Sequence, residues 1–516
     1  MKGFQIQQKG ERRISAALRI MLVIFLLAVQ IALVVAISYF MQEYLALAYA
    51  VVQVAALFLA IHIYNEPGEL SYKLIWFILL LLAPPVGMIL WFLWGGAAQK
   101  RHLPQNGKRV PDEPESVRKR SALAVERLTR QLPGWSRTAN YLCRRDFQLY
   151  QDTRVTYLPE GALLLRELIE QAKKAERFIF LEYFILAEGR LWSELEKILC
   201  AKAHEGVEVK IIFDDFGNIK RFRGETIDRL RDAGVEVFIF NPVHEYVNRL
   251  YFNYRDHRKI ACFDGDVAYT GGVNIADEYA NLIERFGYWK DSGVRLEGPG
   301  ATALANIFLT FWKAQYPDEE IDMDRDLPLA APVKTDCLVQ PFADSPVDRE
   351  AVAKNVYLEL INQAQRRLYI CTPYLILDND LLTCLRLAAK RGVDVRIYTP
   401  GVPDKPTIYQ LTRSYFPHLL RAGVKIYSYT PGFLHAKTWL VDDRIAAVGT
   451  VNLDYRSLYL HFENSVLIYG GAVLEDVRKD LAEIERESKE VTLGDCRTGF
   501  VGTMYSAVLR LVAPLC

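Results

Sequence analysis

The sequence predicts an α/β protein made of two tandem, similar halves, preceded by a helical region that enters a membrane. Three observations support this fold class. The chain is strongly apolar before about residue 97, short β-branched runs alternate with amphipathic helical patterns from about residue 155, and several segments recur about 190 residues later. Such alternation is typical of α/β architecture, and an ordered repeat indicates duplication. The 516 residues also exceed one ordinary domain.

Three apolar segments make up the N-terminal region, at residues 18–40, 44–64 and 74–94. The first two are long enough to cross a bilayer core of about 30 Å as helices. The first is also too long, and too closely followed by the second, to favour a cleaved signal peptide. Pro84 and Pro85 lie in the middle of the third segment, and proline breaks a helix.

Basic residues flank both ends of this apolar block, and the positive-inside rule places both flanks in the cytoplasm. They are Lys2, Lys9, Arg12 and Arg13 before it, and Lys100, Arg101, Lys108 and Arg109 after it. Two spans and a third segment that enters and returns satisfy this rule. We therefore expect a multi-pass membrane protein with a re-entrant third segment, in which the chain after residue 97 lies on the cytoplasmic side.

Composition sets the expected domain boundaries: a membrane region at 1–97, a basic linker at 98–135, a first half at 136–330 and a second half at 331–516. The linker prediction rests on its prolines and on the run Arg118-Lys119-Arg120. Such a run either attracts anionic lipid headgroups or serves as a solvated topology signal.

The repeat consists of three matches in the same order. Leu168-Ile-Glu-Gln-Ala172 returns as Leu360-Ile-Asn-Gln-Ala364, Gly206-Val-Glu-Val-Lys-Ile211 as Gly392-Val-Asp-Val-Arg-Ile397, and Ala233-Gly-Val-Glu-Val237 as Ala422-Gly-Val-Lys-Ile426. Residues 178–181 and 207–213 are predicted strands, and 194–204 a predicted helix. Two homologous halves are expected to pack through a pseudo-two-fold interface, with a site at their seam.

Each half carries the same chemical motif, with the spacing H-x-K-x4-D-x6-G-x-x-N. The first copy is His257, Lys259, Asp264, Gly271 and Asn274; the second is His435, Lys437, Asp442, Gly449 and Asn452. Residues 259–263 and 437–441 are predicted strands, on which residues i and i+2 share a face. Each half is therefore expected to present one imidazole, one ammonium and one carboxamide together.

This set of groups suits a phosphodiester. A neutral imidazole can attack phosphorus, lysines and amides can stabilise charge on the phosphoryl oxygens, and a second, protonated imidazole can donate to the leaving alkoxide. Two lysines already supply positive charge, so we expect no metal and no cofactor. The eight cysteines form no C-x-x-C pair and no zinc spacing.

The sequence leaves two roles open for the carboxylates of the motif. Asp264 and Asp442 belong to the motif and are candidate catalytic residues, but tight turns at Asp264-Gly265 and Asp442-Asp443 give them an alternative, structural role. Asp291, in Trp289-Lys-Asp291, and Glu463, in His461-Phe-Glu463, are better candidates for orienting an imidazole and fixing its tautomer.

These motifs resemble the HKD signature of the phospholipase D superfamily, and nearly the whole chain is similar to bacterial cardiolipin synthases. The similar segments are Pro84-Pro-Val-Gly87, Leu181-Glu-Tyr-Phe-Ile185, Phe213-Asp-Asp-Phe-Gly217, Thr372-Pro-Tyr374 and Arg510-Leu-Val-Ala-Pro-Leu515. The chain departs from the family's G-S-x-N pattern, with glycine at 272 and threonine at 450.

The resemblance implies that two phosphatidylglycerol molecules are joined into cardiolipin with release of glycerol. It makes His257 the nucleophile that forms a phosphatidyl-histidine and His435 the acid and base, with Asn274 and Asn452 binding the phosphate. The partners are then phosphatidylglycerol and anionic membrane lipid. A route from a CDP-activated lipid would need a D-G-x2-A-R cluster, which the sequence lacks.

Several alternatives stay open at this point. A phospholipase D that uses water, or a phosphatidyltransferase with another alcohol acceptor, would carry the same motifs. The net charge of +1 gives no case for a nucleic-acid partner, and intact motifs in both halves argue against a non-catalytic scaffold. Residues 246–254 either form an apolar lip for acyl chains or pack in the core, and 500–515 either lie on the membrane or dock on the body.

Overall fold

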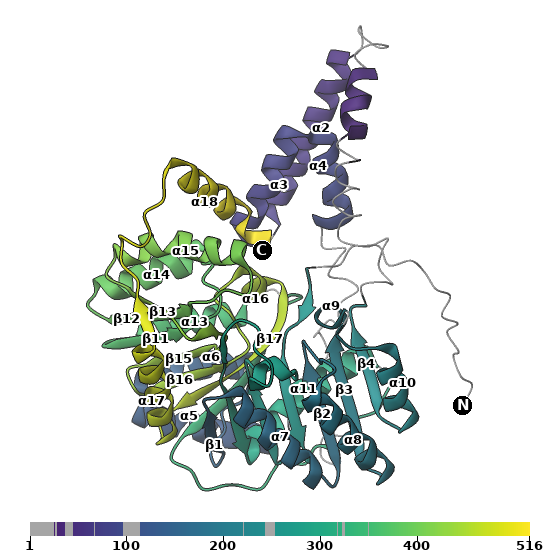
Figure 1. The fold of residues 1–516 in the computed structure, drawn as a ribbon, viewed down its shortest axis with the longest axis vertical. Coiled ribbons are helices and arrows are strands. Elements are labelled where there is room, and N and C mark those ends of the chain that lie inside the picture. Colours follow the sequence, from purple (N-terminus) through teal and green to yellow (C-terminus); the bar gives the residue numbers. More distant parts are fainter. Residues whose placement is uncertain are drawn as a thin grey trace. The chain divides into compact units, whose positions relative to one another are not determined.

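The computed structural model describes residues 25, 28–36, 45–66, 68–95, 114–219, 221–242, 253–316, 318–321, 326–348 and 350–515. The chain divides into two compact units (Figure 1). The membrane unit comprises residues 1–102 with 242–252, and the body comprises 103–241 with 253–516.

The described part of the membrane unit includes helical residues 28–36. It continues with α2 (Leu45–Asn65), α3 (Leu70–Leu82), α4 (Pro84–Leu90) and a π-helical turn (Trp91–Gly95). Among the described residues, only the helix at Leu47–Asn65 is long and apolar enough to cross a membrane, by length and composition. It coincides with the second predicted span. The first predicted span, 18–40, lies largely outside the described residues.

The third apolar segment breaks where its prolines predict. The residue before Pro84 leaves the helical conformation, and α4 begins at Pro84 itself. The chain then folds back: a Cβ on Gly87 would lie 2.9 Å from the carbonyl carbon of Leu79, and the rings of Trp76 and Trp91 meet edge to face at 5.2 Å. The segment is thus a helical hairpin, and its re-entrant path in a membrane stays a prediction.

The first half of the body is a seven-stranded sheet in the order β1-β9-β7-β6-β2-β3-β4, covered by helices (Figure 1). Its strands are β1 (Arg154–Leu158), β2 (Phe178–Tyr183), β3 (Glu208–Asp214), β4 (Glu236–Phe240), β6 (Lys259–Phe263), β7 (Val267–Gly271) and β9 (Gly293–Glu297). Its helices are α7 (Gly161–Lys174), α8 (Arg190–His204), α9 (Asp215–Asn218), α10 (Gly224–Asp232) and α11 (Pro299–Gln315), with a 3-10 turn at Asp277–Ala280.

The second half repeats this order as β10-β17-β16-β15-β11-β12-β13, extended by β18. Its strands are β10 (Leu338–Asp344), β11 (Arg367–Cys371), β12 (Asp394–Pro400), β13 (Lys425–Tyr429), β15 (Thr438–Val441), β16 (Ile445–Gly449), β17 (His461–Tyr469) and β18 (Ser488–Glu490). Its helices are α13 (Val352–Gln363), α14 (Asn379–Lys390), α15 (Pro406–Leu420), α16 (Tyr455–Tyr459), α17 (Val473–Arg486) and α18 (Phe500–Val512), followed by a 3-10 turn (Ala513–Leu515). The predicted duplication and α/β class are confirmed.

The seam between the halves is a shared core. Ile260 and Val294 of the first half belong to the same buried cluster as Val448 and Val466 of the second. Central strands are apolar on both faces because helices and the other half cover them; β2, for example, is buried at all six positions.

Two short parallel strand pairs cross this seam. β5 (Arg255–Asp256) pairs with the start of β17, and β14 (Gly432–Leu434) pairs with β8 (Tyr288–Lys290). In each pair, the strand that enters a His-x-Lys motif lies beside the strand that leads to a carboxylate of the other half. This exchange positions the site.

The predicted linker needs correction. Residues within it form α5 (Glu115–Gln131), which buries Ala124 and Leu128 in the core of the second half. The following helix, α6 (Ser136–Arg144), was assigned to the first half, yet the side chain of Gln340 on β10 donates to the carbonyl of Ala139 at 3.1 Å. The amphipathic spacing of α5 outweighs its basic run, so this segment is a folded part of the second half.

Candidate active site

The crossed strand pairs fix both histidines by backbone hydrogen bonds. The His257 amide donates to the Phe462 carbonyl at 2.9 Å, and the His435 amide donates to the Lys290 carbonyl at 2.7 Å. Each imidazole therefore lies opposite the residue that directly follows the paired residues of the other half, which is Glu463 for His257 and Asp291 for His435.

Each imidazole is held by a buried carboxylate of the other half. His257 Nδ1 lies 3.0 Å from both carboxylate oxygens of Glu463, and His435 Nδ1 lies 2.7 Å from Asp291 Oδ2. Because a carboxylate accepts the Nδ1 proton, each neutral ring presents Nε2 with a free lone pair. The structure thus brings together the two orienting candidates and the two histidines, with the pairs exchanged between halves.

Two buried lysines lie at the histidines. Lys259 Nζ donates to the His257 carbonyl and Lys437 Nζ to the His435 carbonyl, both at 2.5 Å. Burial lowers the pKa of Lys259 to about 7 and that of Lys437 to about 8. The charge of Lys437 lowers the pKa of Lys259 further, and the charges of both lysines lower the pKa of His257. Burial leaves these two ammonium groups poorly solvated, so an anionic ligand would stabilise their charge.

Both imidazoles are neutral in this environment. Burial, followed by the charges of Lys259 and Lys437, holds the pKa of His257 well below its usual range. Burial and Lys437 lower the pKa of His435 to about 4, against the raising effect of Asp291. Burial alone would raise the pKa of Asp291, but His435 and Lys437 lower it, so this carboxyl is ionised.

The two motif asparagines are not equivalent. Asn274 is engaged by the protein: its Oδ1 accepts from the Ile185 amide at 3.0 Å, and its Nδ2 donates to the Tyr279 hydroxyl at 2.7 Å. The Asn452 Oδ1 atom is buried with no hydrogen-bond partner among the residues that the structure describes. The carboxamide of the second half is the one left for a ligand.

The structure places both motif aspartates, Asp264 and Asp442, in hairpin turns, which favours their alternative, structural role over a catalytic one. Each lies seven positions after its histidine, about 20 Å along an extended chain. Both have a positive φ in tight hairpin turns, 55° and 53°. Each carboxylate accepts three backbone N–H groups: Asp264 those of residues 176–178, and Asp442 those of residues 365–367. They clamp the hairpin to the neighbouring strand.

The glycine at 272 has a steric reason. A Cβ there would lie 2.1 Å from Asp291 Oδ1, so any larger residue would displace the carboxylate that holds His435. At the matching position of the second half, the Thr450 hydroxyl donates to Glu463 Oε2. The departure from the family's serine therefore follows from how the two carboxylates are seated.

Aromatic rings wall the site. Phe184 meets the ring of His257 edge-on at 5.1 Å, and the rings of Tyr279, Trp289 and Phe433 lie 5.5–5.6 Å from that of His435. Such walls limit water around the imidazoles. Residues 246–252 of the proposed lip lie outside the described residues, and Tyr254 is buried.

His461 is a site residue that the sequence reasoning missed. Its ring centroid lies 5.5 Å from that of His257, and its Nδ1 lies 3.7 Å from Glu463 Oε1. Neither of its ring nitrogens has a hydrogen-bond partner within the described part of the chain. His257, His461 and Glu463 are also the one described group with spacing that suits a metal ion. The i, i+2 spacing of His461 and Glu463 on one strand was the available signal.

A network of buried ion pairs fixes the strand of the first motif on the face opposite to His257 and Lys259. Arg258 points away from the site, as the strand periodicity predicts: its Nε donates to Asp256 at 3.0 Å, and its guanidinium lies 2.6 Å from Glu182. Arg255 pairs with Asp214 at 3.3 Å. Charged groups this deeply buried are rare unless paired, so the network fixes the path of the strand entering the motif.

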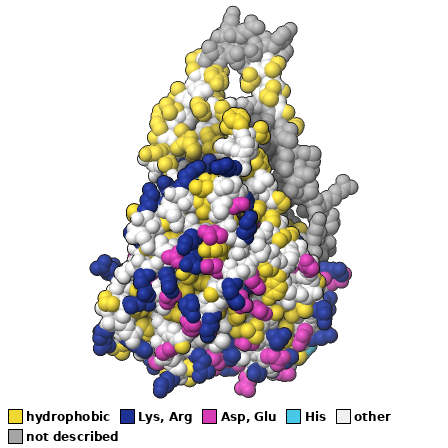
Figure 2. Space-filling view, turned by 60° about the vertical axis from the view of Figure 1, so that its left-hand side comes forward, with side chains coloured by type: hydrophobic (Ala, Val, Ile, Leu, Met, Phe, Trp, Pro, Cys, Tyr) yellow, Lys and Arg dark blue, Asp and Glu magenta, His cyan; other side chains and the backbone are white. Residues whose placement is uncertain are grey.

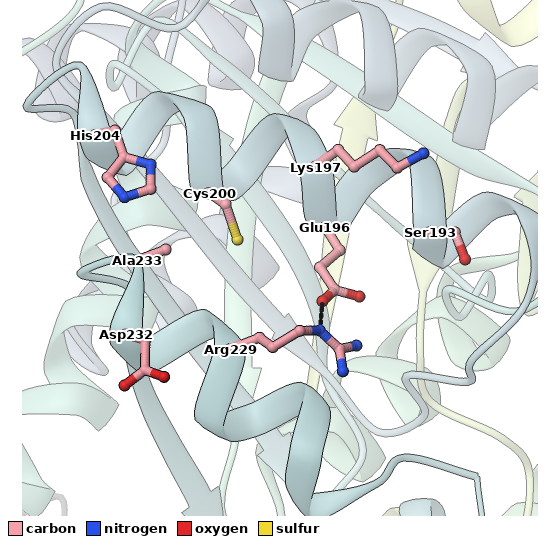
Figure 3. Close-up of a pocket in the computed structure, with 8 residues that line it drawn as sticks. All are labelled: Ser193, Glu196, Lys197, Cys200, His204, Arg229, Asp232 and Ala233. Carbon is pink, nitrogen blue, oxygen red and sulfur yellow. Dashed lines mark hydrogen bonds and ion pairs between the residues drawn. The ribbon is translucent and has the colours of Figure 1, made fainter.

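A hollow on the first half lies between α8 and α10 (Figure 3). Glu196 on α8 accepts from Arg229 on α10 at 2.8 Å across it. None of the motif residues lines this hollow; its lining residues are Ser193, Glu196, Lys197, Cys200, His204, Arg229, Asp232 and Ala233. We assign no part of the chemistry to it.

Comparison with known proteins gives the family. A model described as "Cardiolipin synthase, PLD-like domain" matches residues 165–285 and 357–484, and a "Phospholipase_D-nuclease N-terminal" model matches 54–96. A cardiolipin synthase of Alkalihalophilus pseudofirmus is 33% identical over 468 residues, covering 89% of this chain and 92% of the relative. One of Geobacillus sp. is 32% identical, covering 96% and 98%. The chain belongs to the cardiolipin synthase family.

Membership in the cardiolipin synthase family confirms the resemblance seen in the sequence. It makes the chain a phosphatidyltransferase of the phospholipase D superfamily, with phospholipid substrates and membrane association. An uncharacterized protein of Streptococcus mutans is 45% identical, covering 73% of this chain and 82% of the relative. A phosphatidylserine synthase of Haemophilus influenzae shares the fold, with a TM-score of 0.54 at 18% identity over 70% of this chain and 95% of that one.

Proposed function

We propose that the protein joins two phosphatidylglycerol molecules into cardiolipin and releases glycerol, through a covalent phosphatidyl-histidine. One observation carries this proposal: two neutral imidazoles, each held at Nδ1 by a carboxylate of the other half, flank two buried ammonium groups. Relatives that cover nearly the whole chain are named cardiolipin synthases.

In the first step, Nε2 of His257 attacks the phosphorus of one phosphatidylglycerol. The bond from phosphorus to the glycerol oxygen breaks, and His435 donates its proton to that oxygen, so glycerol leaves. An anionic phosphodiester beside His435 raises the pKa of this imidazole on binding, so the ring takes up a proton from solvent at Nε2 and becomes the donor. This proton returns to solvent when cardiolipin leaves. Lys259 and Lys437 stabilise the charge on the phosphoryl oxygens.

In the second step, a headgroup hydroxyl of another phosphatidylglycerol attacks the phosphorus of the phosphatidyl-histidine. His435 accepts the hydroxyl proton, and the bond from phosphorus to His257 Nε2 breaks. Cardiolipin forms and both imidazoles return to their starting states. One phosphodiester replaces another, so the reaction needs no nucleotide.

The division of roles follows from the two carboxylates. Glu463 faces Nδ1 of His257 with both oxygens and is itself held by Thr450, which orients the ring for attack. Burial, followed by the charges of Lys259 and Lys437, keeps the pKa of this ring low and the ring neutral. Asp291 makes one shorter contact with His435 and raises its pKa, which favours protonation. His257 thus suits the nucleophile and His435 the acid and base.

The side of the membrane belongs to the proposal too. Basic residues on both flanks of the apolar block support a cytoplasmic body and a multi-pass membrane unit. A reporter fused after residue 100 should be active only in its cytoplasmic form. Activity of an external reporter there would overturn this topology.

The direct test incubates the detergent-solubilised full-length protein with phosphatidylglycerol labelled in its headgroup glycerol and in its acyl chains. We expect cardiolipin and free glycerol in equal amounts. His257→Asn should abolish both products, and His204→Asn, at an outer helix far from the motifs, serves as the matched control.

Other outcomes separate the alternatives. Phosphatidic acid and glycerol without cardiolipin would make the protein a hydrolase. Product formed only when another alcohol is added would make it a phosphatidyltransferase with a different acceptor. Either result contradicts the proposed acceptor while leaving the first step intact.

A further inference from the structure

The last helix of the body, α18 (Phe500–Val512), has one buried face and one open face. Leu509 and Ala513 are buried against the second half, with 8% and 1% of their surface exposed. On its other face, six large apolar side chains are 41–82% exposed: Phe500, Val501, Met504, Tyr505, Val508 and Leu511. Apolar side chains that gather on one face of a helix usually mark a contact with a partner or a membrane.

The helix is fixed to the body by polar contacts at both ends. Arg510 NH1 lies 2.6 Å from His418 Nε2 on α15, and Arg413 of the same helix donates to the carbonyl of Asp495 at 2.6 Å, just before α18. The orientation of α18 is therefore set by the body, and its open face stays outside.

Positive charge lies close to α18, which itself contains no acidic residue. Burial and then the charges of Arg510, Arg421 and Arg386 lower the pKa of His418, so three guanidinium groups lie around the end of α15 that contacts α18. Figure 2 shows a band of Lys and Arg side chains on one face of the molecule. An apolar helix face bordered by arginines complements an anionic lipid surface.

We propose that α18 lies in the interface of an anionic phospholipid bilayer, with its apolar face among the acyl chains and the neighbouring arginines at the headgroups. Its 13 residues span about 20 Å, too short to cross the bilayer core. The helix is thus a second, peripheral contact of the body with the membrane, separate from the N-terminal apolar helices.

The position of α18 gives this contact a consequence for the site. The 3-10 turn after α18 (Ala513–Leu515) contacts α16 (Tyr455–Tyr459). α16 begins three residues after Asn452 of the second motif. A helix α18 that lies on the bilayer would therefore keep α16, the segment that follows the second motif, close to the lipid surface.

The test places a photo-crosslinking residue, p-benzoyl-phenylalanine, at Val501 or Tyr505 of the full-length protein in nanodiscs of phosphatidylglycerol and phosphatidylethanolamine. We expect phospholipid adducts by mass spectrometry at both positions. Leu123, which is 57% exposed on α5, is the matched control and should give no lipid adduct; Figure 1 shows α5 and α18 at opposite ends of the body.

Three outcomes would overturn the proposal: no adduct, an adduct to a second copy of the chain, or an adduct to residues 45–95 of the same chain. These readouts do not depend on activity, so failure of the proposed reaction leaves them interpretable.

A second measurement uses the variant Phe500→Gln/Val501→Gln/Val508→Gln, whose positions are exposed and whose fold should be kept. We expect turnover of lipid in vesicles to fall roughly tenfold or more while turnover in detergent micelles stays unchanged, since loss of inserted apolar surface weakens interfacial binding. Equal turnover in vesicles, or an equal loss in both systems, would contradict an interfacial role. Leu123→Gln is the control.

Discussion

The two histidine–carboxylate pairs, His257 with Glu463 and His435 with Asp291, have the same arrangement but differ in the groups that contact each imidazole and its carboxylate. We call each pair a half-site. At His257, both oxygens of Glu463 contact Nδ1, the Thr450 hydroxyl donates to Glu463, and the His461 ring lies beside the His257 ring. Behind His435 are the single short contact to Asp291 and, beyond it, a glycine.

In the proposed reaction, this difference separates the roles of two histidines that a duplication made similar. The crossed strand pairs β5–β17 and β14–β8 are the same in both directions, so duplication explains why there are two histidine–carboxylate pairs. The chemistry needs one nucleophile and one proton carrier. In the proposed reaction, the glutamate with two contacts to His257 and the aspartate with one shorter contact to His435 account for that division.

The largest expected effect separates the two histidines. His257→Asn and His435→Asn should both lower turnover of phosphatidylglycerol by about 10³-fold or more, because each removes a group that every cycle uses. With a phosphatidyl ester of p-nitrophenol, whose leaving group needs no proton, His435→Asn should still release one nitrophenolate per chain in a burst. His257→Asn should show no burst. A burst in His257→Asn instead would reverse the assigned roles.

A substitution next to a carboxylate tests whether the two half-sites are independent. Gly272→Ser restores the family's serine but places a side chain where Asp291 sits, so we expect turnover to fall about 10²-fold through loss of the His435 orientation. The burst with the nitrophenyl ester should survive, since His257 and Glu463 are untouched. Thr450→Ser, which keeps the hydroxyl, is the control. Full activity in Gly272→Ser would contradict the role given to Asp291.

The pH dependence tests the shared lysines. The pKa values of Lys259 and Lys437 are lowered to about 7 and 8, so the protonated forms are lost as pH rises through this range. We therefore expect kcat/KM, measured in detergent micelles, to fall above pH 7–8, well below the usual range of a lysine near 10.5. A profile that stays flat to pH 10 would show that the ammonium groups are not needed or are not perturbed.

The smallest effect on activity is expected at the turn aspartates. Asp442→Asn leaves the site in place but weakens the clamp on three backbone amides, so we expect a loss of about 1–3 kcal/mol in the free energy of unfolding. In the folded fraction kcat should change less than roughly twofold. Thermal melting and active-site titration separate the two quantities. A kcat loss as large as that of His435→Asn would return Asp442 to the chemistry.

Sequence periodicity predicted much of this architecture because it reports local structure and the repeat. The strand at Lys259–Phe263, the hairpin at Asp264 and the break before Pro84 all follow from short-range signals. The exchange of carboxylates did not, since strand pairing between distant segments leaves no local pattern. α5 was missed because its basic run obscured an amphipathic spacing, and His461 because its significance appears only beside His257.

The proposed mechanism depends most on which histidine is the nucleophile. The most direct measurement quenches the wild-type protein at mildly alkaline pH during turnover of acyl-labelled phosphatidylglycerol and maps the modified peptide by mass spectrometry. We expect a phosphatidyl group on His257 and none on His435. A label on His435, or cardiolipin formation at full rate with no labelled histidine in the quenched samples, would contradict the account.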